Sequence, residues 1–210
     1  MRNSNTKELV RTKNILPLIT KEVKIIMEKI HFCSDLHQGH NKIISICNRP
    51  TTILDHDTWL IENFNKYVDK KDSVYILGDL SFEKKEKAEK FIDKLHGQKT
   101  LILGNHDKNI HNSTRFAQIT QIKDFTFSQF GLNIHIVLCH YPIASWNRKV
   151  HGSWHLYGHV HGRFKLPGLA FDVGIDNNEI HQLTENIWRP INLYEICQIM
   201  AKKDELETIE

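Results

Sequence analysis

The chain has 210 residues, of which 40% are hydrophobic and 25% charged, values typical of a globular protein with one full core. The formal net charge of +3 and the pI of about 8.6 are too low to indicate strong nucleic-acid binding. Because no apolar run reaches the length of a membrane span and no secretory leader is recognisable, we expect a cytoplasmic protein without a membrane partner.

Residues 1–26 differ in character from the rest of the chain. They are polar and basic at first, and then carry Ile15, Leu16, Leu18 and Ile19 without a clear period. A strand pattern begins directly at Met27. We therefore expect 1–26 to be an N-terminal extension outside the core, and 27–210 to form the single functional domain.

From residue 27 to about 103, apolar runs typical of strands alternate with segments of helical periodicity. The predicted strands are 29–34, 74–77 and 99–103, and the predicted helices are 40–47, 56–69 and 84–95. A further helical stretch is expected near 113–120. This half of the chain thus has the βαβαβ order of a sheet covered by helices.

The second half of the chain consists mainly of predicted strands. They are 122–128, 133–139, 154–158, 169–174 and 191–196. Taken together, the two halves predict an α/β sandwich, in which mixed sheets pack together and helices cover the outside.

Polar clusters follow five of the apolar runs. They are Asp35-Leu36-His37, Gly78-Asp79, Gly104-Asn105-His106-Asp107, His140 and Gly158-His159-Val160-His161. Open α/β sheets place their sites at the carboxyl ends of the strands, so we expect these clusters to meet there.

The residue types in these clusters indicate metal binding. Asp35 and His37, like His159 and His161, are two positions apart, and residues so spaced on an extended segment point the same way. Together the clusters supply two carboxylates, one amide oxygen and four imidazoles, which suits two transition-metal ions rather than one tetrahedral ion. Asp79 can bridge the two ions with its two oxygens. Two ions about 3.5–4 Å apart can activate water and clamp the oxygens of a displacement at phosphorus.

His106 is not needed as a ligand in this scheme. A histidine beside a phosphate clamp can protonate a leaving alkoxide or stabilise charge on the phosphoryl oxygens. We expect Asp107 to orient His106 and keep it protonated, so both are candidate catalytic residues.

The five blocks, in this order across residues 35–161, resemble the signature of the calcineurin-like metallophosphoesterase superfamily, and the segment 35–50 is similar to its small bacterial and phage members. The resemblance implies a four-layer α/β/β/α sandwich with a dinuclear site at one edge. It also implies three roles. The first metal would be held by Asp35, His37 and His161, and the second by Asn105, His140 and His159. Asp79 would bridge the two ions, and His106 would be catalytic. One departure is that Gly78-Asp79-Leu80-Ser81 lacks the glycine that many members carry shortly after the aspartate.

Four further residues are candidate substrate contacts: His40, Arg49, Arg148 and Arg163. Each lies shortly after one of the blocks, and an arginine there can grip a phosphate through its two-pronged guanidinium. Tyr141, Trp146 and Trp154 are candidates for a wall against a base or an aryl group.

The sequence therefore predicts a hydrolase with two divalent transition-metal ions, Mn²⁺ first, with Fe, Zn or Ni as alternatives. A metal-bridging hydroxide would attack the phosphorus of a phosphodiester, and His106 would assist the leaving group. A phosphomonoesterase acting on a nucleotide, a phosphoprotein or another small phosphate is the close alternative. A non-catalytic scaffold of the same fold and a nuclease are weaker ones.

Overall fold

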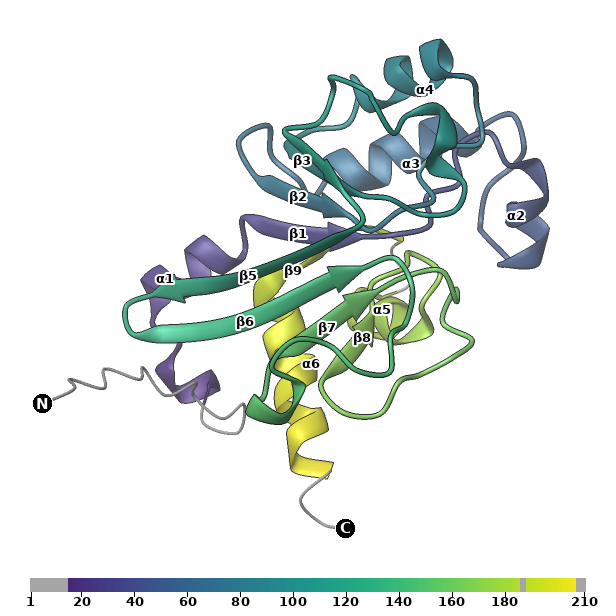
Figure 1. The fold of residues 1–210 in the computed structure, drawn as a ribbon. Coiled ribbons are helices and arrows are strands. Elements are labelled where there is room, and N and C mark those ends of the chain that lie inside the picture. The colour runs from purple at the N-terminus through teal and green to yellow at the C-terminus, as the bar shows by residue number, and fades with distance from the viewer. Residues whose placement is uncertain (1–14, 186–187, 207–210) are drawn as a thin grey trace, which may run out of the picture.

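The computed structural model describes residues 15–185 and 188–206, and in this part of the chain the strands form two mixed sheets (Figure 1). The strands of the first sheet are β1 (Ile30–Cys33), β2 (Ser73–Ile76), β3 (Gln98–Ile102), β4 (Gln118–Thr120) and β9 (Ile191–Asn192). Their order is β4-β3-β2-β1-β9. The four strands β1 to β4 are parallel, and β9 is antiparallel to β1.

The second sheet has the order β5-β6-β7-β8. It consists of β5 (Ile122–Gln129), β6 (Leu132–Cys139), β7 (Trp154–Tyr157) and β8 (Ala170–Asp172). β5 and β6 form an antiparallel hairpin, whereas β6, β7 and β8 run parallel to one another. The parallel strands of each sheet therefore end at a common edge.

Helices flank the sheets, which confirms the expected α/β class. They are α1 (Lys21–Met27), α2 (Asn41–Ile46), α3 (His56–Asn65), α4 (Lys85–Ile92), α5 (Asn178–Leu183) and α6 (Leu193–Leu206), with 3₁₀ turns at Leu16–Leu18, Asp107–Asn109 and Lys149–His151. Phe64 of α3 and Phe91 of α4 pack on Val74 and Leu101 of the first sheet. None of the helices in the described residues is both long and apolar enough to cross a membrane.

The main hydrophobic core joins the two sheets. Phe32 and Ile102 of the first sheet share one buried cluster with Ile136, Leu156 and Phe171 of the second. These side chains are almost completely withdrawn from solvent, and full burial of such a residue stabilises the fold by about 1.5–3 kcal/mol. The sandwich thus fixes the distance between the ends of the two sets of strands.

Residues 15–26 belong to this core, so the expectation that the whole of 1–26 stands apart from it is wrong for this segment. Ile15 is 1% exposed, and Val23 and Met27 are fully buried in the main cluster. Helix α1, which carries Val23 and Met27, contacts α6. The apolar residues show no single period because they are divided between a 3₁₀ turn and a short helix. Residues 1–14 lie outside the described residues.

Two further predicted elements are wrong. The helix expected near 113–120 is instead an irregular segment followed by β4, because Ala117 donates its backbone N–H to the carbonyl of Lys99 and so extends the sheet. The strand expected over 191–196 lasts only two residues before α6 begins.

Helix α6 begins at a reciprocal cap. The N–H of Glu195 donates to Asn192 Oδ1, and the N–H of Asn192 donates to Glu195 Oε2. Leu193, Ile196, Cys197 and Met200 then follow the i, i+3, i+4, i+7 spacing of one buried helix face. The helical spacing is therefore present in the sequence, but the short apolar run at the start of α6 has the pattern of a strand.

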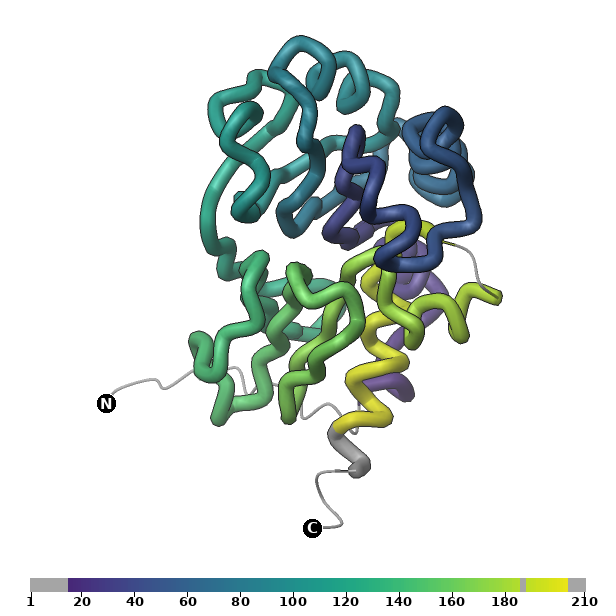
Figure 2. The backbone as a smooth tube through the Cα atoms, turned by 90° about the vertical axis from the view of Figure 1, so that its right-hand side faces the viewer, coloured from purple at the N-terminus to yellow at the C-terminus, as the bar shows by residue number. Residues whose placement is uncertain are grey.

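The topology brings the two sets of strand ends together. Beyond β1, Ser34 forms a parallel backbone bridge with Gly174, which lies beyond β8, and Ile175 donates its N–H to the carbonyl of Ser34. The view in Figure 2 shows residues of about 30–120 (blue to teal) above those of about 120–175 (green), with both sets of loops on the side facing the viewer. The polar clusters therefore meet at one edge of the sandwich.

Removal of residues 1–26 should destabilise the protein, because it deletes the buried side chains of Ile15 and Val23 and strips α6 of a packing partner. We expect the free energy of unfolding to fall by about 3–6 kcal/mol, a large part of the usual 5–15 kcal/mol. Urea denaturation of a chain that starts at Met27 measures this loss. A chain that starts at Ile15 is the matched control, and equal stability of all three chains would contradict the assignment.

Candidate metal centre

Asp35, His37 and His161 form the first group of convergent ligands. Asp35 Oδ1 lies 3.7 Å from His37 Nε2 and 3.9 Å from His161 Nε2. All three side chains offer a ligand atom within 4.8 Å of the others. Because metal–ligand bonds are about 2.0–2.3 Å long, two ligand atoms of one ion lie roughly 3–4 Å apart, and this group fits that spacing.

Asp79, His140 and His159 form the second group, again with ligand atoms within 4.8 Å. His140 Nε2 lies 3.6 Å from Asp79 Oδ1 and 3.2 Å from the amide oxygen of Asn105. The other oxygen of Asp79, Oδ2, lies 3.8 Å from His37 Nε2. Asp79 therefore faces both groups, each with a different oxygen, as a bridging ligand must.

Five of these residues have backbones in the left-handed region, where every residue type other than glycine is strained. The φ angles are 60° for Asp35, 53° for His37, 51° for Asp79, 72° for His159 and 52° for His161. Each such residue costs of the order of 1–3 kcal/mol, and the strain persists only where the surroundings enforce it. The strain at these positions lowers the stability of the fold, but it directs the five side chains into the same space.

Two glycines allow the loops to approach closely enough. A Cβ on Gly104 would lie 2.3 Å from Asp79 Oδ1, and a Cβ on Gly158 would lie 1.9 Å from Ser34 Oγ and 2.7 Å from Asp35 Oδ2. Gly104 links the β3 end to the bridging carboxylate, and Gly158 links the β7 end to that of β1. Glycine is needed at both positions because a side chain there would clash with the neighbouring loop, and not only because the chain turns there.

Two of the imidazoles are oriented by acceptors on their far side. His140 Nδ1 donates to the carbonyl of Leu77 at 2.7 Å, and His161 Nδ1 donates to Asp176 Oδ2 at 2.6 Å. Each acceptor fixes a proton on Nδ1 and points Nε2 toward the carboxylates, the arrangement that usually supports metal-binding histidines.

Several titratable groups in the site have shifted pKa values, because they are buried close to other charged side chains. Burial alone would lower the pKa of His161, but hydrogen bonds to Asp176 and Cys47 raise it to about 10, so metal binding there must displace a proton. Burial and the neighbouring Asp35 raise the pKa of Asp172 to about 7. Burial together with His140 lowers the pKa of His159, which favours the neutral ring that a metal requires.

The donor set fits a pair of divalent cations. Asp35 and Asp79 are 0% and 2% exposed, and buried carboxylates are costly unless a cation compensates them. Among the described buried polar atoms, Asp35 Oδ1 and His37 Nε2 lack a hydrogen-bond partner although both point into the site. These two atoms are the ones a metal ion would satisfy.

Asp107 does not orient His106, and that expectation is wrong. Its Oδ2 accepts the backbone N–H groups of Gly104 and Asp79, and its Oδ1 accepts that of Leu80. Asp107 therefore clamps the loop after β2 to the loop after β3. This clamp fixes the turn at Asp79.

His106 lies at the rim of the site with a side chain that is 41% exposed. Its Nε2 is 3.9 Å from Asp79 Oδ2, and its ring stacks on Phe82 with centroids 4.2 Å apart. Phe82, which the sequence analysis did not single out, holds the ring in place. The position of His106 suits a group that reaches a substrate rather than a metal ligand.

Arg49 is not available to a substrate, so its expected role is wrong. Its side chain is completely buried and forms a two-pronged pair with Asp176, with Nε–Oδ1 and Nη2–Oδ2 distances of 2.9 and 2.8 Å. It also donates to the backbone carbonyls of Asp35 and Leu36. Arg49 is a support for the first ligand group.

The other candidate substrate contacts differ in their proximity to the site. His40 is near it, with its ring 5.6 Å from that of His37 and stacked on Phe82. Arg163 is exposed and donates to the carbonyl of Ile46. Arg148 is exposed beside the 3₁₀ turn Lys149–His151, and no contact in the described residues joins it to the ligands.

Of the three aromatic residues considered as a wall, one is positioned for that role. Trp154 and Trp146 are 1% and 7% exposed and belong to the core and to the outer face of the second sheet. Tyr141 is 43% exposed, and its ring lies 4.9 Å from those of both His140 and His159.

The sequence analysis missed Asp172 and Asp176. Asp176 holds His161 and Arg49, and Asp172 accepts the N–H groups of Gly162 and Gly174. Both follow the apolar run of β8, so they carry the same strand-then-polar signal as the clusters that were recognised. Neither aspartate has a histidine within two residues in the sequence, so neither formed a recognisable metal-binding pattern.

The fold and the site together define an α/β protein of two mixed sheets, with carboxylates and imidazoles gathered where the parallel strands end. The chain belongs to the family of the uncharacterized protein MJ1445 of Methanocaldococcus jannaschii. The two are 32% identical over 187 residues, which covers 87% of this chain and 97% of that protein.

More distant similarities extend over most of the chain. The Gene 66 protein of Mycobacterium phage L5 is 27% identical over 199 residues, covering 77% of this chain and 96% of the phage protein. The crystal structure of the protein of unknown function AQ665 from Aquifex aeolicus superposes with a TM-score of 0.59 at 22% identity, covering 81% of this chain and 98% of that one. This last similarity supports the fold alone. No model of a known protein family matches the chain.

Replacement of Gly104 by Ala should weaken metal binding, because the added methyl group cannot coexist with Asp79 Oδ1 in its present place. We expect titration calorimetry with Mn²⁺ to show at least about a tenfold loss of affinity, which corresponds to 1.4 kcal/mol. Gly131→Ala is the control, because its added Cβ meets nothing within 4 Å although its φ of 85° makes it strained. Equal Mn²⁺ affinity in the two variants would show that Asp79 takes no part in binding.

Proposed function

We propose that the protein is a dinuclear metal-dependent phosphoesterase of the calcineurin-like superfamily. The observation that carries the proposal is the position of Asp79 between two groups of imidazole and carboxylate ligands, each with its own oxygen directed to one group. The two mixed sheets flanked by helices are compatible with the four-layer fold of that superfamily, which stays a prediction.

In this proposal Asp35, His37 and His161 hold the first ion. Asn105, His140 and His159 hold the second, and Asp79 contacts both. Two divalent ions of the Mn²⁺ type would lower the pKa of a bound water and polarise the phosphoryl oxygens. The exposed Tyr141 ring packs edge to face on His140 beside the second group, where it can contact the ester.

His106 supplies the proton that the leaving group needs. Its ring is held by Phe82 at the rim and is exposed to the substrate, and Asp79 Oδ2 is the carboxylate oxygen 3.9 Å from its Nε2. A positioned general acid typically contributes about 10²–10⁴-fold to the rate. Asp107 is engaged with backbone groups, so the ring is held by its stacking on Phe82, while the backbone N–H of His106 donates to Asp79 Oδ1.

Phosphodiesters are the proposed substrates rather than monoesters. The chain devotes few residues to a cap over the site, and an open site accommodates two substituents on phosphorus. Hydrolysis of bis(p-nitrophenyl) phosphate, measured beside p-nitrophenyl phosphate with added Mn²⁺, decides between the two classes. A preference for the monoester would favour a phosphomonoesterase instead.

Asp79→Asn should abolish Mn²⁺-stimulated hydrolysis and weaken Mn²⁺ binding, because it removes the charge shared by both ligand groups while keeping the size of the side chain. Activity and calorimetric titration of the same preparation measure the two effects. Asp93→Asn is the matched control, since Asp93 forms an exposed ion pair with Arg115. A wild-type protein that binds no metal and shows no metal-stimulated hydrolysis would instead support a scaffold.

His106→Ala should lower kcat for the diester by about 10²–10⁴-fold and leave Mn²⁺ binding unchanged. The reason is that the ring lies at the rim and takes no place among the ligands. Asn105→Ala is the comparison, and it should weaken Mn²⁺ binding because the amide oxygen is 3.2 Å from His140 Nε2. Loss of metal from His106→Ala would refute this division of roles.

A further inference from the structure

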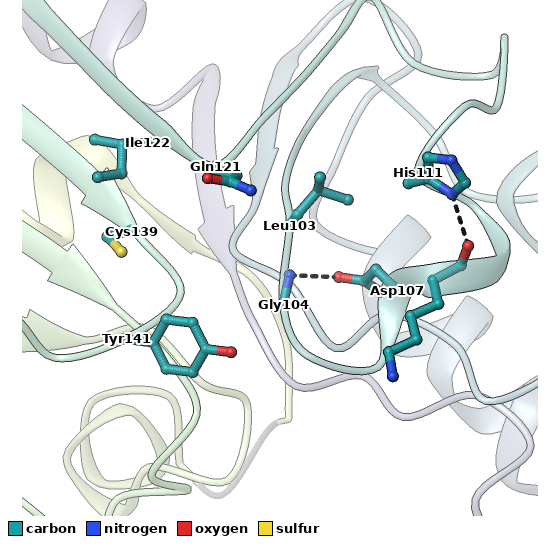
Figure 3. A pocket seen from close by; sticks show the side chains of 9 residues that line it. Leu103, Gly104, Asp107, His111, Gln121, Ile122, Cys139 and Tyr141 are labelled. Atoms are coloured by element: carbon teal, nitrogen blue, oxygen red, sulfur yellow. Dashed lines mark hydrogen bonds between the residues drawn. The ribbon is translucent and has the colours of Figure 1, made fainter.

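A cleft of about 520 Å³ opens beside the second ligand group, between the loop after β3 and the start of the β5–β6 hairpin. Its walls include Leu103, Gly104, Gln121, Ile122, Cys139 and Tyr141 (Figure 3). This volume lies within the range of about 300–1,000 Å³ that is usual for small-molecule sites. The roles proposed above do not use it.

The cleft and the candidate metal centre share a wall. Gly104 directly precedes Asn105, and Cys139 directly precedes His140. The Tyr141 ring meets both His140 and His159 edge to face, with centroids 4.9 Å apart in each case. The cleft therefore lies directly beside the second ligand group.

The lining is largely apolar and partly open to solvent. Ile122 is 54% exposed and Tyr141 is 43% exposed, so both side chains are accessible to a ligand. Figure 3 shows Tyr141 and Ile122 on the side of the second sheet, and Leu103 on the side of the first. Two opposed apolar walls of this kind suit a flat group held between them.

The charged residues around the cleft do not repel an anionic ester. Asp107 belongs to the lining, but its two oxygens accept three backbone N–H groups and are not directed at a ligand. Lys108, also in the lining, adds a positive charge. The cleft thus combines apolar walls with an electrostatic setting that a phosphate ester tolerates.

We propose that this cleft binds a planar aromatic substituent of the ester, either an aryl ring or a nucleobase. The inference rests on the proposed phosphoesterase function and names the substrate class of the same site. Stacking of an aromatic group on an aromatic side chain favours binding, and contact with Leu103 and Ile122 adds to it. An ester that carries only small alkyl groups leaves the cleft unfilled and binds more weakly.

Calorimetric titration of the full chain in excess Mn²⁺ tests the proposal with three probes: methyl phosphate, phenyl phosphate and thymidine 5′-monophosphate. We expect at least one aromatic probe to bind about tenfold or more tightly than methyl phosphate, which is 1.4 kcal/mol. Tighter binding of phenyl phosphate assigns the cleft to aryl esters, and tighter binding of the nucleotide assigns it to nucleosides. Equal affinity for all three probes overturns the proposal.

Two variants test whether the preference for the aromatic probes arises at this cleft. Ile122→Asp and Tyr141→Leu change exposed residues of the cleft, and each should reduce the preference for the aromatic probe to less than about threefold. Phe130→Asp is the matched control, since Phe130 is 74% exposed at the turn of the same hairpin. The β5 strand separates it from Ile122 by roughly 25 Å. A preference that survives both cleft variants overturns the assignment to this cleft.

Hydrolysis of bis(p-nitrophenyl) phosphate by the same preparations separates the two proposals. Hydrolysis without an aromatic preference overturns the role of the cleft alone. An aromatic preference without any metal-stimulated hydrolysis supports the cleft as a binding site and overturns the phosphoesterase function.

Discussion

The buried carboxylate of Asp79 connects the parts of the candidate site. One oxygen faces His140 and accepts the backbone N–H of His106, and the other faces His37. The carboxylate is 2% exposed, so its charge must be compensated by neighbouring donors or by a cation. It lies where the loops that follow β1, β2, β3 and β6 meet.

The residues around Asp79 show how the two-sheet fold holds a buried carboxylate. Asp107 draws the backbone of Asp79 and Leu80 toward Gly104, and the absence of a side chain on Gly104 leaves room for the carboxylate. On the other side, the Arg49–Asp176 pair supports His161. Burial favours a higher pKa for Asp176, yet Arg49 and His161 hold that pKa well below its usual range. Both supports are buried and act on the positions of the ligand side chains.

The junction of the two sheets also accounts for the adjacent cleft. The same hairpin that ends in Cys139 and His140 begins at Ile122, so one face of it contributes to the ligands and its start contributes to the cleft wall. Because Tyr141 lines the cleft and contacts both imidazoles of the second group, the candidate metal centre and the cleft are adjacent.

The sequence by itself determined the strands and helices that lead to the site, and which residues stand at the strand ends, because apolar runs that stop at polar residues are a local pattern. It did not determine the role of Arg49 or Asp107. Both are hydrogen-bonding residues near the ligands in the chain, and whether they face solvent or backbone depends on loops that only the tertiary structure brings together. The same holds for residues 15–26, where burial in the core shared by the two sheets decides the outcome. Local propensity is weak in short segments, so long-range packing settles them.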